Sequence, residues 1–165
     1  IANSQLTFLA LQMRSKGVEC LEFVELCEKG QLYESVASQA GESRSAVKKA
    51  ITQRALFSAN DLPHQRTKIK TTFDRMFPEV AAYLKEAKGK PDGPSKLAKS
   101  LQHAEADLVV RQICGRLRRE GKAQFVSPIH DCLIFLPEDG SIVKESLEVE
   151  FSKLGILPRL EVKDL

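Results

Sequence analysis

The chain has 165 residues, one domain's worth and enough to bury a substantial core. Hydrophobic residues make up 42% and charged residues 28%, as in an ordinary soluble globular domain, and no apolar run is long enough to cross a bilayer. This composition excludes a membrane-spanning role, while the net charge of +3 identifies no partner by itself. The four cysteines fit neither a zinc site nor a disulfide framework, so we expect reduced thiols in a cytoplasmic protein.

Hydrophobic periodicity predicts a series of helices followed by a small sheet. Apolar residues at helical spacing, with Gly, Ser and Pro at the breaks, predict helices over 4–15, 19–28, 32–40, 44–58, 65–76, 78–88 and 95–120. Two β-prone runs predict a hairpin, with strands over 124–129 and 132–136. A helix over 141–154 and a strand over 158–162 follow. This order of elements predicts an α+β fold with a small antiparallel sheet.

Basic residues are concentrated in two segments. Between Gly41 and Thr72 there are seven Lys and Arg residues and only two acidic ones, and a second basic cluster closes the predicted long helix. Such clusters suit partners that carry phosphate groups. A solvated basic helix face is the alternative explanation.

The predicted hairpin has two charged or polar residues, His130 and Asp131, between its apolar strands. Hairpin tips usually carry Gly or Asn, because these residues tolerate positive φ angles. One reading is a tolerated turn in which Asp131 bonds its own backbone. The other is a carboxylate held at a strand end to bind a hard cation such as Mg²⁺.

The segment from Phe125 to Phe135, with Ile-His-Asp-Cys-Leu-Ile at its centre, resembles motif C of the family A nucleic-acid polymerases. The resemblance implies that Asp131 binds the catalytic metal ions and that His130 lies against the primer terminus. Other segments resemble the family in the same chain order. Among them are Gly30 to Tyr33, Phe73 to Tyr83, and the Gln-x-x-x-Ala-Asp segment that begins at Gln102, which in the family runs along the minor groove of the template-primer.

The segment Arg44-Ser-Ala-Val-Lys48 resembles the opening of the family's fingers motif. Positions i and i+4 share one face of a helix, so both cations would be able to grip a nucleotide triphosphate. The family's ring residue falls on Leu56 if the motif is counted from Lys48, and on Phe57 if it is counted from Lys49. The motif therefore departs from the family pattern, and both registers stay open.

The residues Asn3-Ser4-Gln5 resemble the Ser-Gln of the family's first motif. Without gaps the catalytic Asp of that motif is replaced by Ala2. With a two-residue insertion it would precede Ile1, as we expect if the chain is a fragment, since the chain does not begin with Met. In both cases the metal site has one carboxylate where two are required.

The resemblance covers nearly the whole chain and implies three regions. Residues 1–30 are the first-motif part of the palm, residues 31–90 are a fingers-like helical region, and residues 91–165 are the rest of the palm, with the long helix, the His-Asp hairpin, a helix and a C-terminal strand. The implied α+β fold has a small antiparallel palm sheet with a metal-binding hairpin, packed on helices, plus a reduced helical fingers region.

The implied function is template-directed nucleotidyl transfer with two Mg²⁺ ions, as in DNA replication, on a DNA template-primer and dNTP. The nucleotide would be bound by Arg44, Lys48 or Lys49, and Phe57, and nucleic acid by Ser4, Gln5 and Gln102. Two ions are expected only with the missing first-motif Asp, so the full-length protein would be a DNA-directed DNA polymerase and this fragment alone inactive. The alternatives are a catalytically inactive polymerase-like module that binds nucleic acid, and a plain α+β interaction domain. The sequence does not specify DNA or RNA template, dNTP or rNTP, or the oligomeric state.

Overall fold

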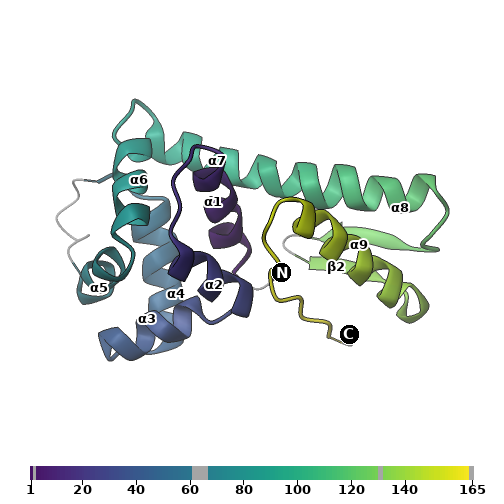
Figure 1. The fold of residues 1–165 in the computed structure, drawn as a ribbon, viewed down its shortest axis with the longest axis horizontal. Helices are drawn as coiled ribbons and strands as arrows, with labels where there is room; N and C mark the ends of the chain where they lie inside the picture. Colours follow the sequence, from purple (N-terminus) through teal and green to yellow (C-terminus); the bar gives the residue numbers. More distant parts are fainter. Residues whose placement is uncertain (2, 61–66, 130–131, 164–165) are drawn as a thin grey trace.

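In the computed structural model, residues 1, 3–60, 67–129 and 132–163 are described. Two groups of elements lie along one long helix, which crosses the whole molecule in Figure 1. The elements in chain order are α1 (Ser4–Arg14), α2 (Leu21–Lys29), α3 (Leu32–Ala40), α4 (Arg44–Ala50), the π-helix η1 (Ile51–Leu56), α5 (Lys68–Met76), α6 (Pro78–Lys88), α7 (Gly93–Glu105), the π-helix η3 (Ala106–Cys114), α8 (Gly115–Arg119), β1 (Val126–Ile129), β2 (Cys132–Phe135), the 3₁₀-helix η4 (Pro137–Asp139) and α9 (Gly140–Lys153).

The described residues are mainly helical with a small two-stranded antiparallel sheet, which is compatible with the predicted α+β fold. The strands β1 and β2 pair from Val126 with Phe135 to Ile129 with Cys132. None of the helices in the described ranges is long and apolar enough to cross a membrane. The three regions expected from the sequence stay a prediction, since the structure does not test their boundaries.

The predicted strand over 158–162 is wrong, because these residues belong to no strand. The segment bends toward α2 instead of running along the hairpin. The N–H of Arg159 donates to the carbonyl oxygen of Glu28 (2.9 Å), and the N–H of Leu157 donates to the Glu28 carboxylate (2.7 Å). Pro158 has no N–H to give to a ladder. A β-prone sequence forms a strand only when another strand pairs with it.

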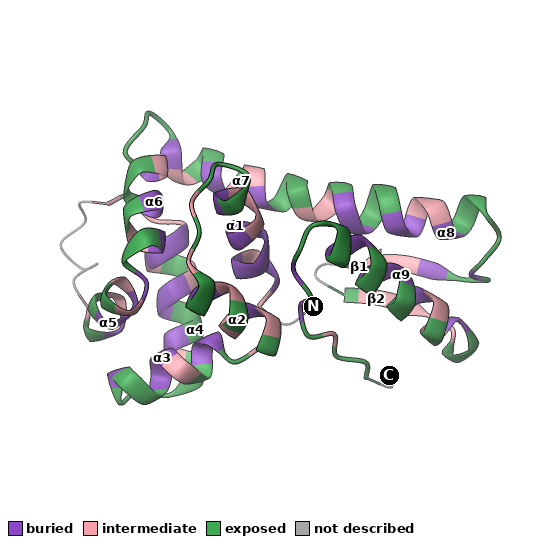
Figure 2. Ribbon diagram, viewed as in Figure 1, coloured by how far each residue is buried: buried purple, intermediate pink, exposed green. Residues whose placement is uncertain are grey.

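Helices α1 to α6 form the first group, and local signals fix where several of them begin and end. The hydroxyls of Ser43 and Thr67 accept the N–H groups of Ala46 and Lys70, which caps α4 and α5. Gly41 ends α3 at φ 62°, a left-handed conformation that favours glycine. The core of this group includes the fully buried rings of Phe23, Phe73 and Phe77. Figure 2 shows the buried faces of these helices turned toward one another.

The long helix runs without a break from Gly93 to Arg119 through α7, η3 and α8, close to the predicted 95–120. Its first half packs against α1 and α6, and its second half against β1 and α9. Gly93 allows α7 to begin directly on the end of α6. A Cβ at this position would lie 2.6 Å from the carbonyl oxygens of Ala87 and Lys88, so no larger residue fits without a shift.

Three side chains hold the hairpin and α9 in place: Arg118 and Arg116 bond them to the long helix, and Asp139 bonds to the segment that enters β1. The guanidinium of Arg118 donates to the carbonyl oxygen of Val126 at 2.6 and 3.1 Å. The buried carboxylate of Asp139 accepts the N–H groups of Gln124 (3.1 Å) and Phe125 (2.9 Å), where the chain enters β1. Arg116 forms an ion pair with Glu150 of α9. These bonds hold the sheet against the helix although it has only two strands.

Candidate functional site

Ser4 and Gln5, which resemble the first polymerase motif, form hydrogen bonds with α7. The sequence of α7 resembles the family's minor-groove helix. The hydroxyl of Ser4 donates to one carboxylate oxygen of Glu105, and the side-chain amide of Gln5 donates to the other at 2.8 Å. Ser4 is buried, and Gln5 and Glu105 are half-buried. The contact joins the start of α1 to the end of α7, about a hundred residues apart in the chain.

Polar atoms without partners surround this contact. The Nδ2 atom of Asn3, the Oε1 atom of Gln5 and the Oγ1 atom of Thr7 are buried and have no hydrogen-bond partner in the described part of the chain. Asn3 also has a φ of 54°, which is unusual for a residue other than Gly. Unpaired buried polar groups cost stability, so native structures contain few of them. Three of the four such atoms in the described residues lie at the start of α1.

The hairpin runs back along the long helix toward the same region (Figure 1). Val126 lies beside Arg118, which donates to its carbonyl oxygen. Ile129 lies three residues farther along β1, a distance of about 10 Å. About seven residues of an α-helix span the same distance. The strand β1 packs against η3, and Ile129 pairs with Cys132 at the end of the hairpin that is farther from Arg118. The predicted catalytic residues His130 and Asp131 lie outside the described residues, as does Ala2.

Gln102, the predicted nucleic-acid contact, lies exposed on α7. It precedes Glu105 by three positions, so the two residues occupy neighbouring places on one helix face. Ser4 and Gln5 thus bond to Glu105, and Gln102 lies one helical turn before Glu105 on the same helix. Glu105 is a residue to which the sequence assigned no role. In the sequence, Glu105 occupies only one of the unspecified positions of the Gln-x-x-x-Ala-Asp segment.

The predicted nucleotide-binding residues lie on α4 and the turn that follows η1. Lys48 and Lys49 are exposed, and no ion pair joins them to another described residue. Arg44 instead forms an ion pair with Glu34, and its guanidinium lies 5.8 Å from the centre of the Tyr33 ring. Burial raises the pKa of the Tyr33 hydroxyl, against a hydrogen bond with Thr52 that lowers it.

The two candidates for the ring position differ in burial. Leu56 is fully buried in the core, whereas Phe57 is half-buried and packs against the core. Of the two residues only Phe57 keeps a partly exposed side chain, which agrees with counting the motif from Lys49. The helix expected over 44–58 continues from α4 into η1, and π-helical segments often occur at functional sites.

Lys88 is a second residue that the sequence did not single out. It is 5% exposed, and its ammonium donates to the carbonyl oxygen of Ala55 in η1 at 2.6 Å. Burial lowers the pKa of Lys88 from its ordinary 10.5 to about 8. The nearby Lys70 acts in the same direction, and Asp74, which pairs with Lys70, acts against it. The buried Lys88 thus fixes the end of α6 to η1.

The magnesium site expected from the sequence depends on a residue outside the described ranges. Within them no three His, Cys, Asp or Glu side chains come together as a metal-binding group. Glu105 is the carboxylate of the site, and both of its oxygens already accept hydrogen bonds. The predicted metal ligand is Asp131, so the Mg²⁺ ions stay a prediction that depends on this residue.

We expect the Glu105 contact to be measurable as a coupling free energy. Glu105→Ala removes a charged acceptor from the buried hydroxyl of Ser4 and the half-buried amide of Gln5, and it should lower the free energy of unfolding by about 2 kcal/mol. A double-mutant cycle with Ser4→Ala should give a coupling of about 1 kcal/mol, measured by urea denaturation. The control is Asp107→Ala. Asp107 pairs with Arg111 at 2.6 Å on the exposed side of the same helix, so its loss should cost less than about 0.5 kcal/mol. Additive effects of Ser4→Ala and Glu105→Ala would contradict the contact.

Comparisons of this chain with family models, with curated proteins and with solved structures found no match.

Proposed function

We propose that this chain is the palm-and-fingers part of a polymerase that resembles family A and catalyses template-directed nucleotidyl transfer on a DNA template-primer. In this proposal the chain holds the primer-template and the incoming dNTP. Two Mg²⁺ ions, when bound at Asp131 and a first-motif Asp, would supply the activation of the primer hydroxyl and the neutralisation of the triphosphate.

The observation that carries the proposal is the contact of Ser4 and Gln5 with Glu105. Two segments that match separate polymerase motifs meet in space, although about a hundred residues separate them in the chain. The hairpin that matches a third motif runs toward the same region along η3. Agreement of this kind supports the family resemblance more strongly than each short motif does alone.

The positions of the other residues suit binding of a nucleic acid. Gln102 is exposed beside Glu105, where it is free to reach the edges of bases in a groove. Lys48 and Lys49 form an exposed cationic pair on α4, and the Nζ atom of Lys68 lies near Gly41, 3.4 Å from where a Cβ would stand. Exposed lysines without acidic partners contribute to phosphate binding through the release of counterions.

The alternative function is a polymerase-like module that binds nucleic acid without catalysis. Arg44 is the observation that favours it. Arg44 is the residue expected to bind the triphosphate, but it already forms an ion pair with Glu34. Its guanidinium also lies over the ring of Tyr33. In the enzyme, Arg44 would have to exchange this ion pair for the phosphate. The pair is exposed, so the exchange costs little free energy.

The test compares two forms of the protein in a primer-extension assay with Mg²⁺ and dNTPs. One is the 165-residue chain, and the other is a form extended at its N-terminus with an Asp immediately before Ile1. We expect the extended form to lengthen the primer, and Asp131→Ala to abolish this activity. The short chain should bind DNA without extending it. Extension by the short chain would contradict the metal-site argument, and binding without extension by either form would favour the non-catalytic module.

A DNA-binding assay distinguishes the contribution of Lys48 and Lys49 from the effect of net charge. Replacing Lys48 and Lys49 together by Ala should lower the slope of log K against log salt by about 2, measured by the anisotropy of labelled DNA. The matched control replaces Lys29 and Lys90, whose ammonium groups already pair with Glu25 and Glu86. An equal change in the control would show that net charge alone governs binding.

A further inference from the structure

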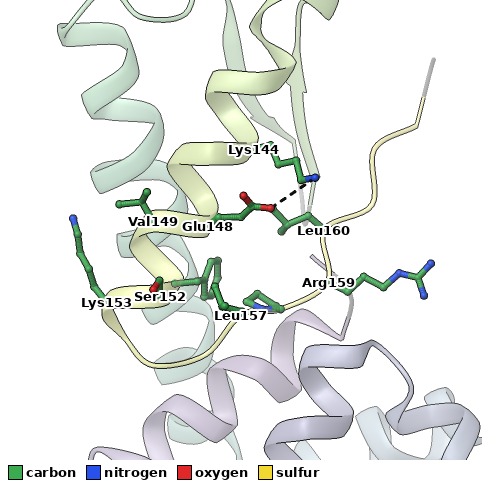
Figure 3. Close-up of a pocket in the computed structure, with 10 residues that line it drawn as sticks. Lys144, Glu148, Val149, Ser152, Lys153, Leu157, Arg159 and Leu160 are labelled. Atoms are coloured by element: carbon green, nitrogen blue, oxygen red, sulfur yellow. Dashed lines mark ion pairs between the residues drawn. The ribbon is translucent and has the colours of Figure 1, made fainter.

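A groove lies between α9 and the segment that follows it, far from the residues of the proposed polymerase site in the chain. Figure 3 shows the side chains of the groove. Its volume is about 660 Å³, within the range of about 300–1,000 Å³ that is usual for ligand-binding sites. The apolar part of its lining comes from Val149, Phe151, Leu157, Pro158 and Leu160.

The groove and its surroundings concentrate exposed apolar surface. Of the eight large apolar side chains that are exposed in the described residues, four belong to this part of the molecule: Val149, Leu154, Leu157 and Val162. Leu157 is 54% exposed and Val149 is 43% exposed, although both line the groove. Apolar patches of this kind on soluble proteins are typical of interaction sites.

Beside the groove, part of the backbone has no hydrogen-bond partner among the described residues. Glu28 anchors the segment at Leu157 and Arg159, as described above. From Leu160 to Lys163, no backbone group forms a hydrogen bond with another described residue. The sequence Leu-Glu-Val in this stretch is β-prone. Backbone groups without partners can pair with an extended peptide, while the adjoining groove receives its side chains.

The charges at the rim determine which peptide fits. Three cationic side chains, Lys144, Lys153 and Arg159, line the groove with one acidic side chain, Glu148. Lys144 pairs with Glu148 at 3.7 Å, and Lys153 pairs with Glu150 at 2.8 Å. Arg159 forms no ion pair within the described part of the chain. In Figure 3 Lys153 and Arg159 lie on opposite sides of Leu157, so the apolar side chain has a cationic residue on each side.

We propose that this groove binds a peptide segment of another protein, in which a short apolar run has acidic residues on both sides. The apolar run would cover Leu157 and Val149. The acidic residues would meet Arg159 at one end and Lys153 at the other. Nucleic acid fits less well, because single strands bind by stacking on exposed aromatic rings, and the ring of Phe151 in this groove is fully buried.

The probe is a fluorescein-labelled peptide with a central Leu-Val-Leu run and paired Asp residues on both sides. We expect saturable binding to the 165-residue chain, measured by fluorescence anisotropy. Leu157→Asp and Arg159→Glu should each weaken it by about tenfold or more, as the loss of an interface hot spot does. The matched controls are Val110→Asp and Lys99→Glu, which make the same changes on exposed positions of the long helix and should alter the affinity by less than about twofold.

Further probes distinguish this occupant from others. The same peptide with Lys in place of Asp should not bind, and a labelled single-stranded oligonucleotide should not compete. Equal binding of the Lys peptide, or competition by the oligonucleotide, would overturn the proposal. So would sedimentation that shows a dimer which Leu157→Asp dissociates, because a second copy would then fill the groove.

A measurement on the unaltered protein keeps the proposal testable even if the variants fail to fold. The labelled-peptide titration is repeated with ¹⁵N-labelled protein, and the amide shifts are mapped. We expect the shifts to be confined to α9 and residues 156–163. Shifts centred on α4 or α7, or no shifts at saturating peptide, would rule the groove out.

Discussion

Replacing Phe73 by Ala should lower the free energy of unfolding by about 3–5 kcal/mol, the usual cost of deleting a buried ring. Phe73 is fully buried, and its ring centre lies 6.4 Å from that of Phe23 and 5.3 Å from that of Phe77. All three pairs of rings meet edge to face, an arrangement that adds to the burial energy. Because domains of this size are stable by only about 5–15 kcal/mol, the loss is a large fraction of the total free energy of unfolding.

Equilibrium denaturation in urea, followed by circular dichroism, measures this loss. The control is Phe125→Ala, which removes a ring that is 47% exposed and should cost less than about 1 kcal/mol. Phe73→Leu keeps much of the buried volume and should fall between the two. A loss below about 1 kcal/mol for Phe73→Ala would mean that the three rings do not form the core that joins α2, α5 and the start of α6.

Lys88→Met should remove a pH-dependent part of the stability that amounts to about 3 kcal/mol. Burial lowers the pKa of Lys88 to about 8 in the folded chain, from its ordinary 10.5. Between these two values the unfolded chain binds more protons than the folded one, so the free energy of unfolding rises with pH. Below about pH 8 both states hold the proton, and above about pH 10.5 neither does, so the change is confined to this window.

The measurement is the difference in free energy of unfolding between the wild type and Lys88→Met from pH 7 to pH 10.5. This difference should grow in favour of the wild type as the pH rises. Lys85→Met removes an exposed ammonium group from the same helix, and its profile should stay parallel to that of the wild type. Parallel profiles for Lys88→Met would show that the buried amine does not titrate in this window.

Most helices of this chain could be predicted from sequence because their signals are local. The apolar spacing and the caps at Ser43, Gly41 and Pro78 act within one or two turns, and the structure places the helix ends within a few residues of the prediction. The hairpin was predicted for the same reason, since its two strands are adjacent in the chain. The strand over 158–162 failed because strand formation depends on a distant partner, and the segment bonds to Glu28 instead.

The candidate site was predicted only in part, for a related reason. The residues Ser4, Gln5 and Gln102 followed from motif resemblance, and in the structure Ser4 and Gln5 bond to Glu105, one helical turn after Gln102. Their partner Glu105 and the buried amine of Lys88 have no local signal. A carboxylate or a lysine on a helix is ordinarily a solvated side chain, and only the packing of α1 on α7 and of α6 on η1 gives these two residues their contacts.

The long helix sets how the two groups of elements are able to move relative to each other. From Gly93 to Arg119 it forms one rod about 40 Å long, with α1 and α6 attached to one half and the hairpin and α9 to the other. No loop interrupts the rod, and the two groups also contact each other directly: the ring centres of Phe8 and Phe151 lie 5.9 Å apart, and Arg14 donates to the carbonyl oxygen of Gly155 at 2.7 Å. The middle third of the rod is η3, where the π-type pattern departs from regular α-helical bonding. A change in the angle between the two groups would therefore require the helix to bend and these direct contacts to break, and Glu105 stands immediately before η3.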